Sequence, residues 1–193
     1  TDVIRQVDVV GAKAGMEMRN NAIMAVLISM VFMIIYIWVR YEFTFGLMGI
    51  VALFHDVIIL VGVFAFTQKE FTMTILAAIL TLVGYSINDT IVIYDRIRED
   101  LKIYRKDSVP IIFNRAINKT LGRTVITGST TFATAIALYF FGGPVIHDFA
   151  LAMSLGIIIG TYSSIFIASN LVLETFVHTR TEKQAIKHLT KKK

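Results

Sequence analysis

The sequence predicts an all-α, polytopic membrane helix bundle with five transmembrane helices. Of the 193 residues, 55% are hydrophobic and only 17% are charged, and the mean hydropathy is +0.68. Soluble domains are about 45–50% apolar and about 25% charged. Five apolar segments approach the ~20 residues that a spanning helix needs. None alternates as a membrane β-strand would, and a segment in lipid must satisfy its own backbone amides, so we expect helices.

The five predicted spans set the domain organisation. They cover residues 22–39, 45–66, 71–94, 124–141 and 145–173. Residues 1–20 are expected to end an external domain and lead into the first span. Residues 21–174 then form the transmembrane domain, and residues 175–193 form a basic cytoplasmic tail. Because the chain opens on Thr1 without the features of a signal peptide, we expect it to be a piece that follows an earlier helix.

The distribution of Lys and Arg predicts the orientation. If the loops alternate sides, four of the 19 Lys and Arg residues lie on the side of the N-terminus and 15 lie on the other. Cytoplasmic loops carry the excess of positive charge. The N-terminus of this chain is therefore predicted outside and the C-terminus in the cytoplasm of a cell, or inner, membrane.

The longest predicted loop contains a further helix, at about residues 109–121. Ser108 is suited to cap it and Pro110 is tolerated in its first turn. Its apolar and polar residues fall mostly on opposite faces, which predicts an interfacial cytoplasmic helix. Such a helix either transmits movement or simply rests on the lipid headgroups.

An acid in the third span raises the question of function. It is Asp89, in the motif GYSINDTIVIYDRIRED (residues 84–100), with Asn88 and Thr90 beside it. Five residues of helix before the interfacial Tyr94 place Asp89 roughly 7–8 Å deeper in the membrane. An isolated ionised carboxylate there costs a few kcal/mol. Burial favours the neutral form of the acid, whereas a nearby cation favours the ionised form. Asp89 is therefore a candidate proton carrier; the alternative is an acid paired permanently with a cation.

Arg123 is the predicted partner of Asp89. It begins the fourth span on the cytoplasmic side, toward which Asp89 also lies. Antiparallel neighbouring helices would bring the two to similar depth, and an arginine stays charged whatever the state of Asp89. The alternative is an ordinary interfacial arginine whose head group reaches water.

Two further polar sets lie inside the spans. The fourth span carries hydroxyls at helical spacing, which either line a hydrated path to Asp89 or pack between helices: Thr127, Thr130, Thr131 and Thr134. His55 and Asp56 stand near the middle of the second span and point about 100° apart, so they cannot both face one partner. They are candidates for a pH relay, because His titrates in the physiological range, or for a structural contact.

Several classes of chemistry lack a signal in the sequence. There is no Walker motif, no dinucleotide-binding glycine pattern and no metal-spaced His cluster. Without cysteines there are no disulfides or thiolate metal sites. We therefore expect no enzyme, metal or cofactor; the energy source is an ion gradient, with protons favoured and Na⁺ the alternative, or a partner protein. The basic tail suits anionic lipid headgroups or ribosomal RNA, although a solvated positive-inside anchor is the commoner explanation. We expect it to contact membrane lipids and no nucleic acid.

Four motifs resemble the SecF branch of the SecD/SecF family of protein-export membrane proteins, in the RND superfamily, and occur in the same order. They are LFHDVIIL (53–60), GYSINDTIVIYDRIRED (84–100), TLGRTVITGSTT (120–131) and FGGPVIHDFALAMSLGIIIGTYSSIFIA (141–168). The lead-in VVGAKAGMEMRNNAI (9–23) is also similar, although Ala12 stands where the family often has proline. The resemblance covers nearly the whole chain.

This resemblance implies an RND-type half containing helices two to six of a six-helix subunit, with an external domain between helices one and two. A SecF subunit works with SecD to draw a translocating preprotein from the SecYEG channel, driven by the proton-motive force. YajC and YidC are further expected partners. The family's relay acid falls on Asp89 and its essential arginine on Arg123. No SecD half is present, so a relay shared by two halves is incomplete in this chain.

Two other functions stay open from the sequence. One is a small-molecule or lipid exporter half of the same superfamily, which would share the buried acid. The other is a passive assembly factor that only stabilises the translocon. Charge-conserving changes at Asp89 and Arg123 would then alter the yield of the complex and leave activity unchanged.

Overall fold

The computed structural model is a bundle of antiparallel helices and describes residues 12–41, 43–69 and 71–178. The helices are α1 (Ala12–Arg40), α2 (Phe43–Phe66), α3 (Met73–Ile103), α4 (Val109–Phe141) and α5 (Pro144–Tyr162). They confirm the predicted all-α membrane bundle. The predicted end of an external domain, up to residue 11, and the basic tail from residue 179 lie outside the described residues.

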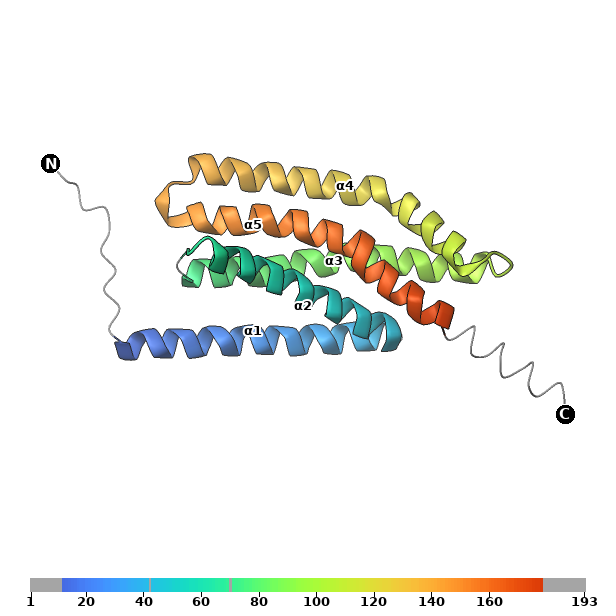
Figure 1. Ribbon diagram of the computed structural model, residues 1–193, viewed down its shortest axis with the longest axis horizontal. Coiled ribbons are helices and arrows are strands. Elements are labelled where there is room, and N and C mark those ends of the chain that lie inside the picture. The colour runs from blue at the N-terminus through green and yellow to red at the C-terminus, as the bar shows by residue number, and fades with distance from the viewer. Residues whose placement is uncertain (1–11, 42, 70, 179–193) are drawn as a thin grey trace.

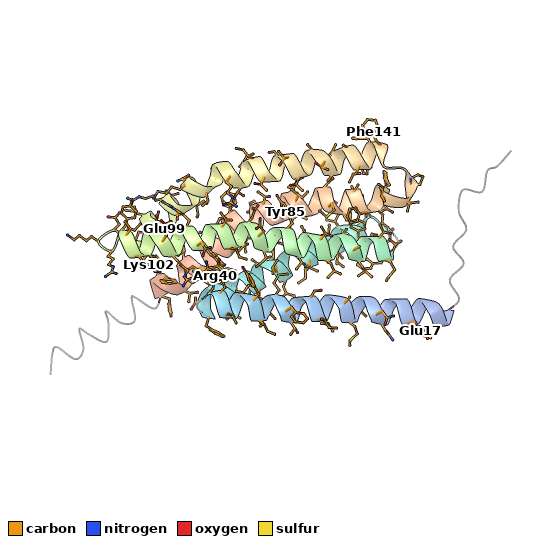
Figure 2. All side chains as sticks on the ribbon, turned by 180° about the vertical axis from the view of Figure 1, so that it is seen from behind. Glu17, Arg40, Tyr85, Glu99, Lys102 and Phe141 are labelled. Atoms are coloured by element: carbon orange, nitrogen blue, oxygen red, sulfur yellow. The ribbon has the colours of Figure 1, made fainter. Side chains whose placement is uncertain are left out.

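Successive helices cross the bundle in alternating directions (Figure 1). The α1–α2 and α3–α4 connections therefore share one end, and the α2–α3 and α4–α5 connections share the other. Figure 2 shows Arg40, Glu99 and Lys102 gathered at the first end, which we call the charged end, while Phe141 lies at the opposite end. The positive-inside rule predicts that the charged end is cytoplasmic.

Four of the described helices are long and apolar enough to cross a membrane. They are Phe43–Phe66, Met73–Ile103, Val109–Phe141 and Pro144–His178. The first predicted span, residues 22–39, lies within α1, where the described residues give a shorter apolar stretch, Ile23–Ile37. The chain is thus a multi-pass membrane protein.

Two predicted boundaries differ from the structure at the charged end. Helix α3 continues nine residues past Tyr94 to Ile103, where Arg96 pairs with Glu99 and Asp100 one turn ahead and such pairs support a helix. The sequence predicts separate helices at 109–121 and 124–141, whereas the structure has the single helix α4. Gly122 alone does not end a helix in the absence of a nearby proline.

The last span changes its winding halfway. After α5 the chain forms a π-helical segment, η1 (Ser163–Ala168), and continues as α-helix through residue 178. Short π-helical insertions are rare and are frequent at functional sites. In this arrangement both Ser163 and Ser164 are buried inside the bundle, with exposed fractions of 0% and 1%.

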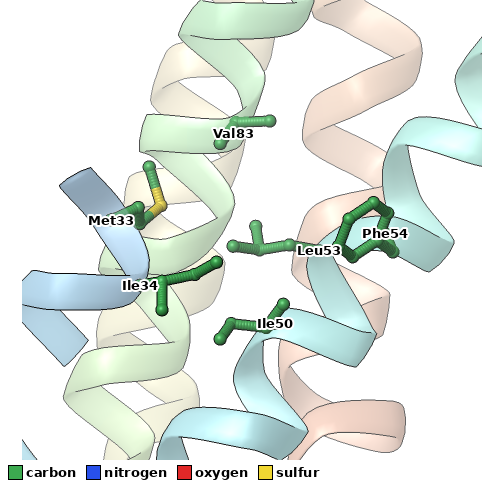
Figure 3. Close-up of a pocket in the computed structure, with 6 residues that line it drawn as sticks. All are labelled: Met33, Ile34, Ile50, Leu53, Phe54 and Val83. Atoms are coloured by element: carbon green, nitrogen blue, oxygen red, sulfur yellow. The ribbon is translucent and has the colours of Figure 1, made fainter. Parts of the chain in front are cut away.

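Helix α3 is the central element, since it contacts α1, α2, α4, α5 and η1. Near the charged end its Tyr94 stacks edge-on against Phe45 of α2, with ring centroids 5.1 Å apart, and donates a hydrogen bond to the carbonyl of Ala168 at 3.1 Å. Helix α1 packs more loosely and leaves a small apolar cleft against α2 and α3 (Figure 3). That cleft is lined by Met33, Ile34, Ile50, Leu53, Phe54 and Val83.

A buried acid joins α3 to α4 at the charged end. Asp100 is fully buried and accepts hydrogen bonds from Lys119 Nζ at 3.1 Å, and Arg96 Nη2 lies 3.2 Å from the same carboxylate. We call these three residues the Asp100 cluster. Lys119 is one helical turn before Arg123, so the cluster fixes where α4 presents Arg123 to α3.

Replacing Asp100 with Ala is expected to lower the free energy of unfolding by roughly 2–3 kcal/mol, because hydrogen bonds to charged groups are lost. Thermal unfolding in detergent measures the change. The control is Asp107→Ala, which removes a half-exposed pair with Arg115 at 2.9 Å and is expected to cost less than about 1 kcal/mol. Equal losses for the two variants would contradict a special role for the buried acid.

Candidate functional site

Two carboxylates are buried within the membrane-spanning part of the described residues. Asp56 of α2 is 1% exposed and Asp89 of α3 is 4% exposed. A third buried acid, Asp100, belongs to the cluster at the charged end. Because an ionised carboxylate in an apolar interior needs compensation, the surroundings of Asp56 and Asp89 show what each acid can do.

Asp89 lacks the compensation that a permanent structural charge would have. Its Oδ2 atom is buried without a hydrogen-bond partner among the described residues. The charge of Arg123 acts on this carboxylate, yet the two side chains form no ion pair within 4.0 Å. The sequence-predicted pair is therefore within electrostatic range without direct contact.

Other polar groups gather on the same side of α3. Tyr85, one turn before Asp89, has a buried hydroxyl beside Thr131 of α4 and Thr161 of α5. Gly128 makes room for this contact, since a Cβ added there would lie 3.2 Å from the Thr161 hydroxyl and 3.6 Å from that of Tyr85. The acid thus faces a polar seam between α3, α4 and α5.

Arg123 stands at the inner end of an open groove. The groove extends to the charged end and is lined by Val92, Asp95, Arg96, Glu99, Lys119, Thr120 and Arg123. Arg123 itself is exposed. The groove thus carries polar and charged side chains of both α3 and α4 from the charged end to Arg123.

The remaining predicted residues are divided among different surroundings. Thr127 and Thr131 are half-buried, whereas Thr130 is exposed on the outside of α4. The hydroxyls of Thr130 and Thr131 donate to carbonyls of their own helix. Asn88 is exposed on the outside of α3, whereas Thr90 is buried inside the bundle. Of these five residues, Thr131 lies beside the buried Tyr85 hydroxyl and Thr90 beside the buried Ser164 hydroxyl.

Asp56 is held by hydroxyls from a second helix. Ser86 of α3 donates a hydrogen bond to Asp56 Oδ2 at 2.7 Å, and His55 Nδ1 lies 3.1 Å from Oδ1. Ser164 in turn bonds to Thr90 at 2.9 Å and donates to the carbonyl of Ser86 at 3.2 Å. A continuous polar cluster therefore crosses from α2 through α3 to η1.

Sequence reasoning missed Ser86, Ser164 and Tyr85. Serine and tyrosine in an apolar run give no signal by themselves, because small hydroxyls pack between most membrane helices. The available signal was the spacing of Ser86, three residues before Asp89 and therefore on a neighbouring face of the helix.

Glycines let α5 approach α3 closely enough to complete these contacts. A Cβ at Gly156 would lie 2.6 Å from the side chain of Leu82, and one at Gly160 would lie 3.1 Å from that of Ser86. The GIIIG motif thus provides the close helix contact that its spacing favours.

Within the described residues, no group of three or more His, Cys, Asp or Glu side chains is arranged to hold a metal ion. A buried carboxylate such as Asp89 or Asp56 is a group that can exchange a proton or bind a small cation.

Comparison with known proteins adds the family. Residues 1–178 match the family described as protein export membrane protein SecD/SecF, C-terminal. The chain belongs to the SecD/SecF family. The resemblance inferred from the four motifs is confirmed, and several relatives that match the chain are protein translocase subunits SecF.

Individual SecD/SecF relatives cover most of the chain. The protein translocase subunit SecF of Koribacter versatilis is 48% identical over 170 residues, which are 88% of this chain and 42% of that protein. A crystal structure of SecDF from Thermus thermophilus, a translocon-associated membrane protein, has a TM-score of 0.82 and 48% identity over 86% of this chain and 23% of its own. SecDF in a super-membrane-facing form has a TM-score of 0.81 and 44% identity over 93% and 24%. The chain spans about half the length of the SecF proteins it matches.

Proposed function

We propose that this chain is the membrane part of a SecF subunit that, together with SecD, uses the proton-motive force to drive late-stage export of polypeptides. Membership of the SecD/SecF family supports a role in protein export. The observation that carries the ion-coupled mechanism is Asp89, which is buried with Oδ2 unpartnered while the charge of Arg123 acts on it.

In the proposed cycle, the proton on Asp89 sets the attraction between α3 and α4. The ionised carboxylate attracts Arg123, whereas the neutral acid does not. Because the Asp100 cluster joins the two helices at the charged end, the change is expressed as movement of the spans beyond it. That movement is passed to an external domain, which acts on the translocating preprotein.

The exposed face of α4 supports a partner helix in the membrane. The outward residues of its middle turns are small or polar, since Thr130, Ala133, Thr134 and Ala137 are all exposed. Large apolar residues flank this stretch, with Ile126 67% exposed and Phe140 71% exposed. By contrast, α1 exposes large apolar side chains, including Phe32 at 68%. Large apolar surfaces suit lipid, and small or hydroxylated ones suit close helix contacts. We propose that SecD covers this face of α4, with SecYEG, the preprotein, YajC or YidC contacting the complete complex.

The test uses the full-length protein assembled with SecD and SecYEG in vesicles. Completion of export is recorded under an imposed proton gradient, under a sodium gradient, and with both dissipated. We expect export to be stimulated by the proton gradient alone. Stimulation by the sodium gradient alone would show that sodium, and not the proton, is the coupling ion. Export that does not respond to either gradient would overturn the proposed function in favour of passive assembly.

A further inference from the structure

The Asp56 cluster contains an acid without a permanent counter-charge. Its carboxylate meets the hydroxyls of Ser86 and Ser163 and the imidazole of His55. Among the described residues, His55, its neighbour on α2, is the one titratable group that acts on it. No described Lys or Arg pairs with it, unlike Asp100, which two cations contact.

A buried hydroxyl also faces this acid without a hydrogen bond of its own. Ser163 is 0% exposed, its Oγ atom has no partner among the described residues, and it lies beside the Asp56 carboxyl group. It opens the π-helical segment η1, whose winding brings Ser163 and Ser164 together onto α2 and α3. A buried hydroxyl without a partner requires an explanation, and short π-helical segments are frequent at functional sites.

His55 connects the buried acid to the surface of the bundle. Its side chain is 35% exposed, whereas Asp56 beside it is 1% exposed. The distance of 3.1 Å between His55 Nδ1 and Asp56 Oδ1 is within range for direct proton transfer.

We propose that Asp56 is a second proton-exchanging group, distinct from Asp89, and that His55 carries its proton between the cluster and the surface of the bundle. In the neutral acid, the proton on Oδ1 is donated to His55 Nδ1 while Ser86 donates to Oδ2. Transfer breaks the Oδ1–H bond, forms Nδ1–H and leaves a carboxylate beside an imidazolium. Because His55 lies in the middle of a membrane span, the imidazolium releases its Nε2 proton to a carboxylate or a water molecule held by the subunit that covers this face of α2. The return step takes a proton up from the same group.

The charge on Asp56 would also set how tightly η1 is held. The ionised carboxylate would also draw a hydrogen bond from Ser163, whose Oγ atom has no partner among the described residues, in addition to those from Ser86 and His55. The neutral acid uses Oδ1 as a donor and would attract the Ser163 hydroxyl less strongly. Ser86 and Thr90 flank Asp89 on α3 and contact Asp56 and Ser164. The two acids therefore act on the same two turns of α3. An effect of Asp56 on export through these turns of α3 rests on the proposed function, whereas the proton exchange at Asp56 does not.

The test is infrared spectroscopy of the full-length protein in lipid nanodiscs over a pH titration. The carbonyl stretch of a protonated carboxylic acid is followed in the unmodified protein, in Asp56→Asn and in Asp89→Asn. We expect one titrating band that is absent in Asp56→Asn and present in Asp89→Asn. Asparagine still accepts the Ser86 hydrogen bond, so this variant is expected to fold. If Asp56→Asn leaves every band unchanged across the titration, Asp56 is a fixed acceptor and the proposal is wrong.

Two further variants test the route and the unpaired hydroxyl. His55→Gln keeps a polar side chain but cannot carry the proton, and is expected to slow deuterium exchange into the Asp56 band by about 100-fold. Ser163→Ala is expected to shift the frequency of that band without changing the fold. Unchanged exchange in His55→Gln would overturn the role of His55. The infrared spectra do not depend on export activity. A failure of the proposed function at Asp89 can therefore be distinguished from a failure of the proposal for Asp56.

Discussion

Asp89→Asn is expected to reduce proton-driven export to the level measured without a gradient, while the complex with SecD still assembles. Asparagine has nearly the same shape but cannot ionise, so the attraction of Arg123 is permanently lost. Folding should survive, because Asp89 Oδ2 makes no hydrogen bond in the structure that asparagine would break. Proton flux and completion of export in vesicles, with the yield of complex measured in parallel, check this outcome.

The matched control is Asp95→Asn on the same helix. Asp95 is half-exposed and pairs with Arg40 at 3.4 Å near the charged end, and pairs of this kind contribute little. Its loss is expected to leave flux and export close to those of the unmodified protein. If Asp89→Asn behaves like Asp95→Asn, Asp89 is a buried structural charge. If it lowers only the yield of the complex, the passive assembly function is favoured.

The sequence was sufficient for the fold class and for most of the span positions. Runs of apolar residues near membrane length leave a helix as the structure that satisfies the backbone. The helix boundaries near the charged end were harder to predict, because charged residues there continue the helices through pairs such as Arg96 with Asp100. Residues 109–121 join the fourth span in the single helix α4 because Gly122 alone does not end a helix.

The candidate site was predictable where a residue is unusual for its own segment. Asp89 stands out as an acid in an apolar run, and antiparallel neighbours place Arg123 near it. The Asp56 cluster was less predictable, because Ser86 and Ser164 become significant only through contacts between segments 30 and 108 residues away from Asp56. The winding of η1, which buries two adjacent serines, has no signal in hydrophobic periodicity.

Gly156→Ala is expected to destabilise the bundle by roughly 1–3 kcal/mol, the range for overpacking a filled core. The new Cβ would lie 2.6 Å from Leu82 Cδ1 and 2.7 Å from Cδ2. Leu82 is fully buried and therefore has no free space into which to rotate. Helix α5 must then move away from α3. Thermal unfolding of the full-length protein in detergent, followed by loss of helical signal and of monodisperse protein, measures the effect.

Gly62→Ala is the control, because no atom of the described residues lies within 4 Å of a Cβ at that position. It is expected to stabilise α2 by about 0.5–1 kcal/mol, since alanine loses less conformational entropy in a helix. If both alanines behave alike, close packing of α5 on α3 is not what holds the bundle together. If they separate as expected, Gly156→Ala should also weaken the contacts of Ser164 with Thr90 and Ser86. Proton exchange at Asp56 should then change even though no titratable group has been altered, because the helix that carries Ser163 has moved.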